Sequence, residues 1–316
     1  MRKYIFKRIL QIIPLLIISI TINFALIRMA PGDPIQYLMS DPEAPAVYIK
    51  ELREAHGLDQ PIYIQYIKYI RKVVTGDFGY SFFYHQPVLG IILSRMQATL
   101  LLTITAFVLS LVFGVLFGVI ASKNPYSLTD TGISISSMIV WAMPSFWVAM
   151  LLIVLFSVIF PIFPIGGLQT PATGGDIFDI LWHLVLPASA LGLGGMAGYT
   201  RLVRANMLEE MDKDYIIYAW SKGLSENSVY FGHAFRNALL PIVTSIGLRL
   251  RFLFTGAALT EIVFAWPGIG RLLNESIFRR DYYMITCIFI MIAVVTMLSN
   301  LLADVLYAYV DPRISY

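Results

Sequence analysis

The chain of 316 residues has few charged residues and a single cysteine. Charged residues make up 14% and hydrophobic residues 58%, with a mean hydropathy of +0.72. A soluble domain carries roughly a quarter charged residues. This shortage of charge excludes a soluble globular protein and predicts an integral membrane protein. Because Cys287 is the only cysteine, the chain can form neither an internal disulfide nor a cysteine-based metal site.

Sequence patterns for catalysis, nucleotide binding and nucleic-acid binding are also missing. No Gly-x4-Gly-Lys-Ser/Thr loop is present, so the chain lacks the phosphate cradle of a P-loop ATPase. The four histidines form no ligand-spaced pair: His56, His85, His183 and His233. The net charge of +3 and the lack of a basic run interleaved with aromatic residues exclude nucleic acid as a partner. We therefore expect no catalytic residues, no metal and no enzymatic activity on this chain.

Long apolar runs are present instead. A helix that crosses a bilayer needs about 20 apolar residues, and six runs approach or exceed this length. They are approximately Ile9–Ile27, Leu100–Ala121, Ile133–Phe160, Leu181–Tyr199, Leu239–Val263 and Met284–Leu306. The predicted fold is therefore all-α and integral to the membrane, with six transmembrane helices. Pro144 and Pro187, inside the third and fourth runs, predict kinks or breaks.

Small residues at helical spacing predict where these helices pack closely. Gly114 and Gly118 form a G-x3-G pair in the second run, and Gly194 and Gly198 form another in the fourth. We expect both pairs to lie at helix–helix contacts, because glycine lets two backbones approach each other.

The positions of Lys and Arg predict the orientation of the chain. Both the chain start and the segment 201–238 are rich in basic residues, so we expect them, and both termini, to be cytoplasmic. The predicted division has four parts. These are a cytoplasmic N-terminus with the first transmembrane helix (1–30), an extracytoplasmic loop region (31–98), a five-helix core with a cytoplasmic loop at about 201–238 (99–310), and a cytoplasmic C-terminal tail (311–316).

The extracytoplasmic loop region contains an amphipathic pattern in "AVYIKELREAHGLDQPIYIQYIKYIRKVV". Gly57 predicts the end of one helix and Pro61 the start of the next. The aromatic content of this segment suits packing at the outer face of the membrane.

The cytoplasmic segment "DYIIYAWSKGLSENSVYFGHAFRNALLP", which begins at Asp214, is helical in pattern. Asp212 and Asp214 offer an N-cap and negative charge at a helix N-terminus. Lys222 and Gly223 are typical of a helix C-terminus, and Ser225-Glu226 can start a second short helix.

One face of this first helix combines apolar and small residues. Ile216, Ala219, Trp220 and Gly223 recur at helical spacing, and the small Ala219 and Gly223 predict a shallow dent. Such a helix is shaped to be held in a groove of a partner protein. An amphipathic helix lying at the lipid interface fits the same pattern equally well.

This segment resembles the "EAA" loop of binding-protein-dependent ABC importer permeases, whose general pattern is E-A-A-x3-G-x9-I-x-L-P. Ala219 and Gly223 match the second alanine and the glycine, whereas Ile217 replaces the glutamate and Tyr218 the first alanine. The stretches "AWSKGLS" and "HAFRNALLP" are similar to the peptide/nickel subfamily, in which the loop reads A-x-A-K-G-L-S and then H-A-x-R-N-A-L-L-P.

Further stretches extend the resemblance along the whole chain. They are "RILQIIPLLIISITINFALIRMAPGDP", "HGLDQPIYIQYIKYIRKVVTGDFGYS", "WPGIGRLL" and "NLLADVLYAYVDPRI". On these motifs the sequence is identified as a member of the peptide/nickel subfamily. It resembles the first of the two permease subunits of a dipeptide or oligopeptide importer.

The resemblance implies a type I ABC importer permease fold in a prokaryotic cytoplasmic membrane. The implied partners are a homologous second permease in a heterodimer, two cytoplasmic ATPase subunits, and an extracytoplasmic substrate-binding protein. ATP and magnesium belong to the ATPase subunits, and no cofactor is expected on this chain. Substrate choice lies largely in the binding protein, so nickel chelates and glutathione stay open as alternative substrates. A secondary transporter is the competing class, but no acidic ion relay is evident.

The resemblance also implies a role for individual residues. The loop would form a coupling helix inserted into an ATPase, in which Ala219 and Gly223 permit close approach. Arg236 and Asn237 would orient the loop. The complete set of expected coupling residues is Ile217, Tyr218, Ala219, Gly223, Leu224, Ser225, Arg236 and Asn237.

Two arginines lie well inside the fifth apolar run. Arg249 and Arg251 are two residues apart, which on a helix separates their directions by about 200°. A charge facing lipid costs several kcal/mol, so at least one should face the bundle interior, the partner permease or a water-filled passage. Our hypothesis is that one of them lines the translocation pathway. A structural ion pair or a headgroup contact is the alternative.

Glu261 lies near the outer end of the fifth run and precedes "VFAWPGIG". A carboxylate beside a tight Pro-Gly turn can form part of an outer gate or a docking edge. The alternative is an interfacial turn anchored by Trp266.

Overall fold

The structure is a computed structural model, and it describes residues 2–29, 59–81, 83–171, 175–239, 241–242, 245 and 257–310. These residues form helices and no strands, and an isolated antiparallel bridge between Tyr80 and Pro87 is the single β-type pairing among them. The predicted all-α class is confirmed. The chain divides into two compact units, one containing residues 1–96 and 272–301 and the other residues 97–271 and 302–315. Each unit is considered separately.

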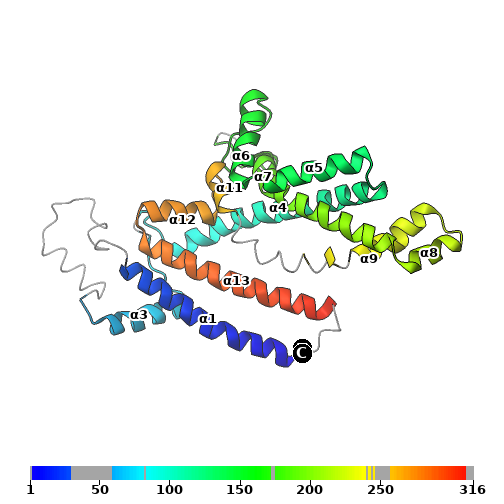
Figure 1. The fold of residues 1–316 in the computed structure, drawn as a ribbon. Coiled ribbons are helices and arrows are strands. Elements are labelled where there is room, and N and C mark those ends of the chain that lie inside the picture. Colours follow the sequence, from blue (N-terminus) through cyan, green and yellow to red (C-terminus); the bar gives the residue numbers. More distant parts are fainter. Residues whose placement is uncertain are drawn as a thin grey trace. The chain divides into compact units, whose positions relative to one another are not determined.

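The first unit contains α1 (Arg2–Met29), α3 (Ile62–Thr75), the start of α4 (Val88–Lys123), the end of α12 (Ile269–Phe278) and most of α13 (Tyr282–Val310). Helices α1 and α13 lie side by side and antiparallel (Figure 1). The Asn23 side-chain amide donates a 3.0 Å hydrogen bond to the Thr286 carbonyl between them.

Helix α3 begins directly after Pro61 and ends at Gly76, whose φ of +73° is left-handed. The start predicted at Pro61 is confirmed to within one residue, since Pro61 stands just before the first helical residue. Gly57 lies outside the described residues. The aromatic rings of Tyr66 and Tyr69 pack on Phe24 of α1, with ring centroids 5.3 and 5.5 Å apart.

The second unit contains the rest of α4 and a series of further helices. They are α5 (Leu128–Ala142), α6 (Ser145–Ile153), η1 (Val154–Ile159), α7 (Ile177–Met211), α8 (Asp214–Ser221), η2 (Ser228–Phe235), α9 (Arg236–Ala238), α11 (Ala258–Val263) and the start of α12.

Glycines hold α4 and α7 close together. A Cβ added to Gly114 would lie 2.5 Å from the Tyr199 Cβ, and one added to Gly118 would lie 2.5 Å from the Val203 Cβ. The expected packing role of Gly114 and Gly118 is therefore confirmed. A Cβ on Gly194 meets nothing within 4 Å, so the same expectation is not met there among the described residues.

The two prolines act differently. At Pro144 the pair α5 and α6–η1 is bent by 106°, so the predicted break in the third run is confirmed. Pro187 lies inside α7, which continues through it as one helix. Continuation is possible because neighbouring groups in a membrane bundle can satisfy the backbone carbonyl that proline leaves free.

Three described helices are long and apolar enough to cross a membrane: α4, α7 and the Tyr282–Leu301 part of α13. The bent pair adds a fourth if it forms one span, and α1 has a shorter apolar portion, Leu10–Leu26. Most of the fifth run lies outside the described residues, so the number of six spans stays a prediction. Among the described helices, the largest differences from the predicted runs are the start of α4 at Val88, where Leu100 was expected, and the end of α7 at Met211, where Tyr199 was expected.

Candidate functional site

The candidate site is the segment that follows the long helix α7. Helix α7 ends at Met211, and α8 begins three residues later at Asp214. The N-cap position of α8 is Lys213, without a side-chain cap, and Asp212 is the C-cap of α7. The predicted N-cap role of Asp212 is therefore wrong, because α7 is longer than its apolar pattern indicated. Asp214 lies in the first turn of α8, where its negative charge favours the helix N-terminus.

The end of α8 follows the predicted pattern. Gly223 adopts a left-handed φ of +74°, a conformation that costs other residues free energy. Its N–H donates to the Trp220 carbonyl at 2.9 Å, and the Leu224 N–H donates to the Ala219 carbonyl at 3.4 Å. These bonds satisfy carbonyls at the end of the helix. The C-terminal signal at Gly223 is thus confirmed.

A second helical segment follows the turn, as predicted from Ser225-Glu226. Residues 226–227 are helical and continue into η2 and the short α9. The Val229 N–H donates to the Ser225 carbonyl at 3.0 Å.

The inner face of α8 packs on the chain's own core. Ile216 and Ala219 are buried in a cluster with Val203 and Met207 of α7 and with Val229 of η2. The expected dent at Ala219 on a partner-facing surface is therefore wrong. The small side chain instead lets α8 lie close to neighbouring helices of the same chain.

The outer face of α8 is apolar and exposed. Ile217, Tyr218 and Trp220 are exposed to 58%, 63% and 42%, and Leu224 follows just beyond the helix at 37%. These four residues are called the exposed α8 face. The Lys222 ammonium lies 4.5 Å from the centre of the Tyr218 ring, a cation–π contact at the edge of this face.

A polar network fixes the turn between α7 and α8. The Glu210 carboxylate accepts hydrogen bonds from the Lys213 ammonium at 2.5 Å and from the Tyr215 hydroxyl at 2.6 Å. The Asn237 amide donates to the Tyr215 hydroxyl at 2.9 Å. Burial raises the pKa of Tyr215, and the hydrogen bond to Glu210 raises that pKa further. Tyr215 therefore keeps its proton and links three helices.

Two residues near this network, Asn237 and Arg236, were expected to orient the loop. Asn237 does contact α8 through Tyr215, whereas Arg236 is exposed. Sequence reasoning missed Tyr215 and Glu210. The spacing of Glu210 and Lys213, three residues apart across a helix end, is the signal that indicates this contact.

Two further contacts lie in the same unit: one attaches η2 to α4, and the other attaches α7, from which the segment continues, to α5. The Tyr230 hydroxyl of η2 donates to the Val119 carbonyl of α4 at 2.8 Å and lies 2.6 Å from the Ser122 hydroxyl. The Arg204 guanidinium of α7 donates to both oxygens of the buried Asp130 of α5, at 2.5 and 2.6 Å. Neither contact is visible in the sequence, because each joins residues far apart along the chain.

Glu261, expected at an outer gate or docking edge, is fully buried. Its carboxylate accepts hydrogen bonds from the Thr99 hydroxyl at 2.7 Å and from the N–H groups of Gly270 and Arg271 at 2.7 and 3.1 Å. These N–H groups belong to the first turn of α12, where a negative charge is stabilising. The carboxylate thus caps a helix of its own chain and is not exposed as a docking edge.

The neighbouring turn is anchored by Trp266, as in the alternative interpretation, and the location of this turn at the membrane interface stays a prediction. The Trp266 ring is buried, and its indole N–H donates to the Ala98 carbonyl at 2.9 Å. Arg249 and Arg251 lie outside the described residues, so their placement in a translocation pathway stays a prediction.

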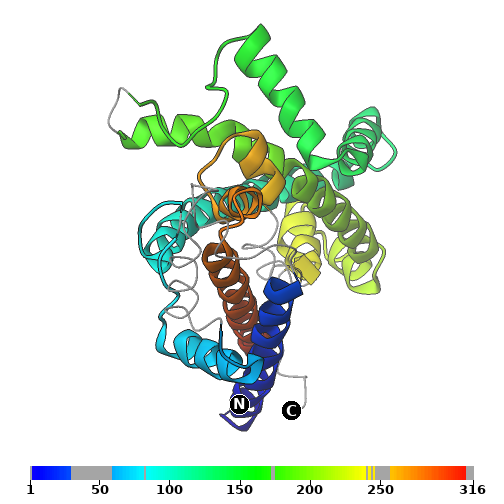
Figure 2. The same cartoon turned by 90° about the vertical axis from the view of Figure 1, so that its left-hand side faces the viewer.

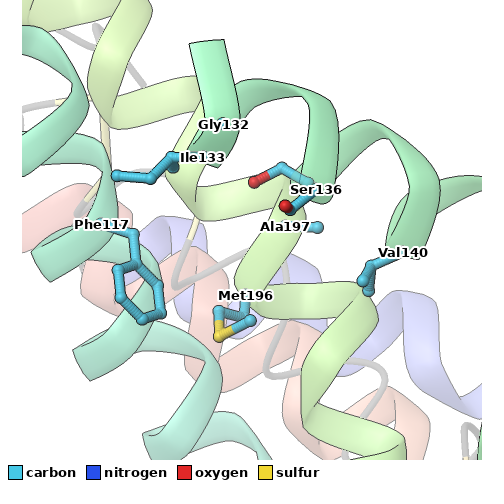
Figure 3. A pocket seen from close by; sticks show the side chains of 8 residues that line it. Phe117, Gly132, Ile133, Ser136, Val140, Met196 and Ala197 are labelled. Carbon is cyan, nitrogen blue, oxygen red and sulfur yellow. The ribbon is translucent and has the colours of Figure 1, made fainter. Parts of the chain in front are cut away.

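An apolar cavity of about 280 Å³ opens between α4, α5 and α7 (Figure 3). No predicted site residue lines it. Its lining consists of Phe117, Gly132, Ile133, Ser136, Ser137, Val140, Met196 and Ala197. The described part of the chain contains no group of three or more His, Cys, Asp or Glu side chains placed to hold a metal ion.

Two family models match the chain. Residues 114–316 match the "Binding-protein-dependent transport system inner membrane component". Residues 1–103 match the model described as "Binding-prot-dependent transport system membrane comp, N-term".

Similar proteins cover the chain from end to end. The oligopeptide transport system permease protein AppB of Bacillus subtilis (strain 168) is 43% identical over 317 residues, with 100% of each chain covered. The glutathione transport system permease protein GsiC of Escherichia coli (strain K12) is 40% identical over 320 residues, also with 100% of each covered. The di/tripeptide transport system permease protein DppB of Pseudomonas aeruginosa (strain UCBPP-PA14) is 36% identical over 334 residues, covering 100% of this chain and 99% of the relative.

These matches, the apolar helices and the helical segment after α7 agree with one another: the chain belongs to the inner-membrane permease components of binding-protein-dependent ABC importers.

Proposed function

We propose that this chain is a transmembrane subunit of an ATP-driven peptide importer. It forms the translocation pathway with a homologous second permease and receives the motion of cytoplasmic ATPases through the exposed α8 face. The observation that carries this proposal is a set of four exposed apolar side chains on a segment that is packed and hydrogen-bonded to its unit.

The exposed α8 face has the properties of a docking surface. Tyr218 and Trp220 are large aromatic residues of the kind that anchor protein interfaces, and both are solvent-exposed here. Beneath them, Ile216 and Ala219 are buried in the chain's own core. The helix is therefore held from one side and open on the other, as a surface gripped in a partner's groove requires.

The segment is also attached strongly enough to transmit movement. The Tyr215 network holds α8 to α7 and α9, Tyr230 holds η2 to α4, and the Arg204–Asp130 pair holds α7 to α5. Because hydrogen-bonded and packed elements move as units, a displacement of α8 would be passed to α4, α5 and α7.

Attachment to lipid is the alternative for α8. Interfacial helices carry Lys and Arg on their polar face, whereas residues 212–228 contain acidic Asp212, Asp214 and Glu226 against two lysines. This charge balance disfavours an anionic membrane surface and favours a protein groove.

The proposed cargo is a peptide. Two of the relatives named above are oligopeptide and di/tripeptide permeases, and a third is a glutathione permease. Glutathione or a nickel chelate is the alternative cargo. The proposed partners are the second permease, two ATPase subunits that bind ATP and magnesium, and an extracytoplasmic binding protein. Both termini are proposed to be cytoplasmic.

The test uses the complete transport complex in proteoliposomes. In the variant Tyr218→Ser/Trp220→Ser, removal of both anchors should lower ATP-driven peptide uptake by about tenfold or more, the factor that ~1.4 kcal/mol produces. The ATPase subunits should also be lost when the tagged permease is purified. Asn227→Ser, exposed but outside the exposed α8 face, is the matched control and should keep both properties. Undiminished uptake and ATPase retention in the double variant would contradict the proposal.

A further inference from the structure

Helix α3 is fixed against α1 by one of its sides. Tyr66 and Tyr69 pack on Phe24, and the Tyr66 and Thr21 hydroxyls share a hydrogen bond of 2.5 Å. Both contacts fall near the C-terminal end of α1's apolar portion, Leu10–Leu26. At 1.5 Å per residue, they lie within about 8 Å of that end.

The position of these contacts along α1, close to the end of its apolar portion, indicates that α3 lies near a membrane surface. Around them α1 exposes large apolar side chains, among them Ile18, Ile22 and Leu26, as a helix surrounded by acyl chains does. Helix α3 lies across α1 rather than along it (Figure 2). With α1 crossing the membrane as its sequence predicts, a helix that crosses α1 near the end of its apolar portion runs in the plane of the membrane surface.

A second side of α3 is an exposed apolar stripe. Tyr63, Ile67 and Val74 are exposed to 66%, 63% and 77%. Their spacing of four and seven residues puts them on one side of the helix, next to the side that meets α1. Nothing in the described part of this unit covers them.

The third side is basic. Lys68, Arg71 and Lys72 are all exposed and recur at spacings of three and four residues. The sequence of α3 contains no acidic residue. The apolar stripe is therefore bordered by a purely cationic stripe.

We propose that α3 is an interfacial helix that binds anionic phospholipid at the membrane surface beside the C-terminal end of α1. Tyr63, Ile67 and Val74 insert among the upper acyl-chain segments, and Lys68, Arg71 and Lys72 bind headgroup phosphates. The apolar stripe matches the edge of the hydrocarbon layer, and the adjoining cations match the layer of headgroup phosphates. The crosswise placement of α3 on α1 matches the plane of the membrane surface. This inference does not depend on the cargo or on ATPase coupling.

The test measures where each side of α3 lies. The full chain with Cys287→Ser is labelled with an environment-sensitive fluorophore at Val74→Cys, or at Thr75→Cys on the polar side as the matched control. It is then placed in nanodiscs of phosphatidylcholine with or without phosphatidylglycerol. Lipids carrying a nitroxide on the acyl chain should quench the Val74 probe about twofold more strongly than the Thr75 probe. Equal quenching at the two positions would overturn the insertion, and would mean that protein or water covers the stripe.

The basic stripe is tested in the same nanodiscs. In the chain labelled at Val74→Cys and otherwise carrying only Cys287→Ser, phosphatidylglycerol should strengthen the quenching of the probe. Lys68→Gln/Arg71→Gln/Lys72→Gln should abolish that increase, and Lys68→Arg/Lys72→Arg, which keeps the charges, should retain it. An increase that survives in the triple variant would overturn headgroup binding by these residues. Monodisperse elution of every variant excludes unfolding as the cause of a change.

Discussion

The Tyr215 hydroxyl donates a 2.6 Å hydrogen bond to the Glu210 carboxylate across the turn between α7 and α8, and it accepts another from Asn237 of α9. One side chain thus joins three helices around the exposed α8 face. This hydroxyl positions that face relative to α7 together with the Lys213–Glu210 hydrogen bond and the buried Ile216 and Ala219.

Removal of this hydroxyl should loosen α8. We expect Tyr215→Phe to lower the free energy of unfolding by about 1 kcal/mol and to reduce peptide uptake relative to ATP hydrolysis. Tyr80→Phe removes a hydroxyl from a ring that is 65% exposed and outside the exposed α8 face, and it should change neither quantity. Thermal unfolding in detergent and uptake in proteoliposomes measure the difference. Equal behaviour of the two variants would show that Tyr215 does not position α8.

Substitutions at Gly223 can distinguish two reasons for a glycine at this position: its left-handed backbone conformation, and the space that a partner protein needs beside it. A Cβ at Gly223 meets nothing within 4 Å of its own chain, yet its φ is +74°. Gly223→Asn should therefore be tolerated better than Gly223→Ala, because asparagine adopts the left-handed region more readily. If close approach to an ATPase is what requires glycine, the larger asparagine should be the more damaging. ATPase retention on purification and coupled uptake distinguish the two outcomes.

A double variant tests the Arg204–Asp130 pair, in which Asp130 is buried and Arg204 is 25% exposed. Removal of Asp130 takes away the charged hydrogen bonds of a guanidinium that water reaches in part, and such bonds contribute about 1.5–3 kcal/mol. We expect Asp130→Ala to lower the thermal unfolding temperature. Asp130→Ala/Arg204→Ala should recover part of that loss, because no unpaired cation remains. A double variant less stable than Asp130→Ala would show that the two residues act separately.

The contact between α4 and α7 leaves no space for a methyl group at Gly118. We expect Gly118→Ala to destabilise the chain by about 1–3 kcal/mol, because Val203 lies directly against this position. Gly194→Ala, at a glycine with open space around it, should be neutral in the isolated subunit. If Gly194→Ala proves deleterious only in the assembled complex, that side of α7 contacts a partner.

Features that depend on neighbours along the chain were predictable from the sequence. The apolar runs indicated membrane helices, Pro144 indicated the break before α6, and Gly223 and Ser225 indicated the turn between two short helices. Each follows from local chemistry: the length of an apolar stretch, a missing N–H group, or a left-handed φ. The family resemblance also rested on short contiguous motifs.

The direction in which a helix face points was decided only by the tertiary structure. Periodicity grouped Ile216, Ala219 and Trp220, but packing on α7 and η2 turned Ala219 inward and left Trp220 partly exposed. Glu261 likewise became a buried helix cap, because Thr99 and the start of α12 supplied its hydrogen bonds. A sequence pattern indicates only how side chains are spaced around a helix. Which partner a helix face meets depends on helices distant along the chain, and therefore on the folded arrangement.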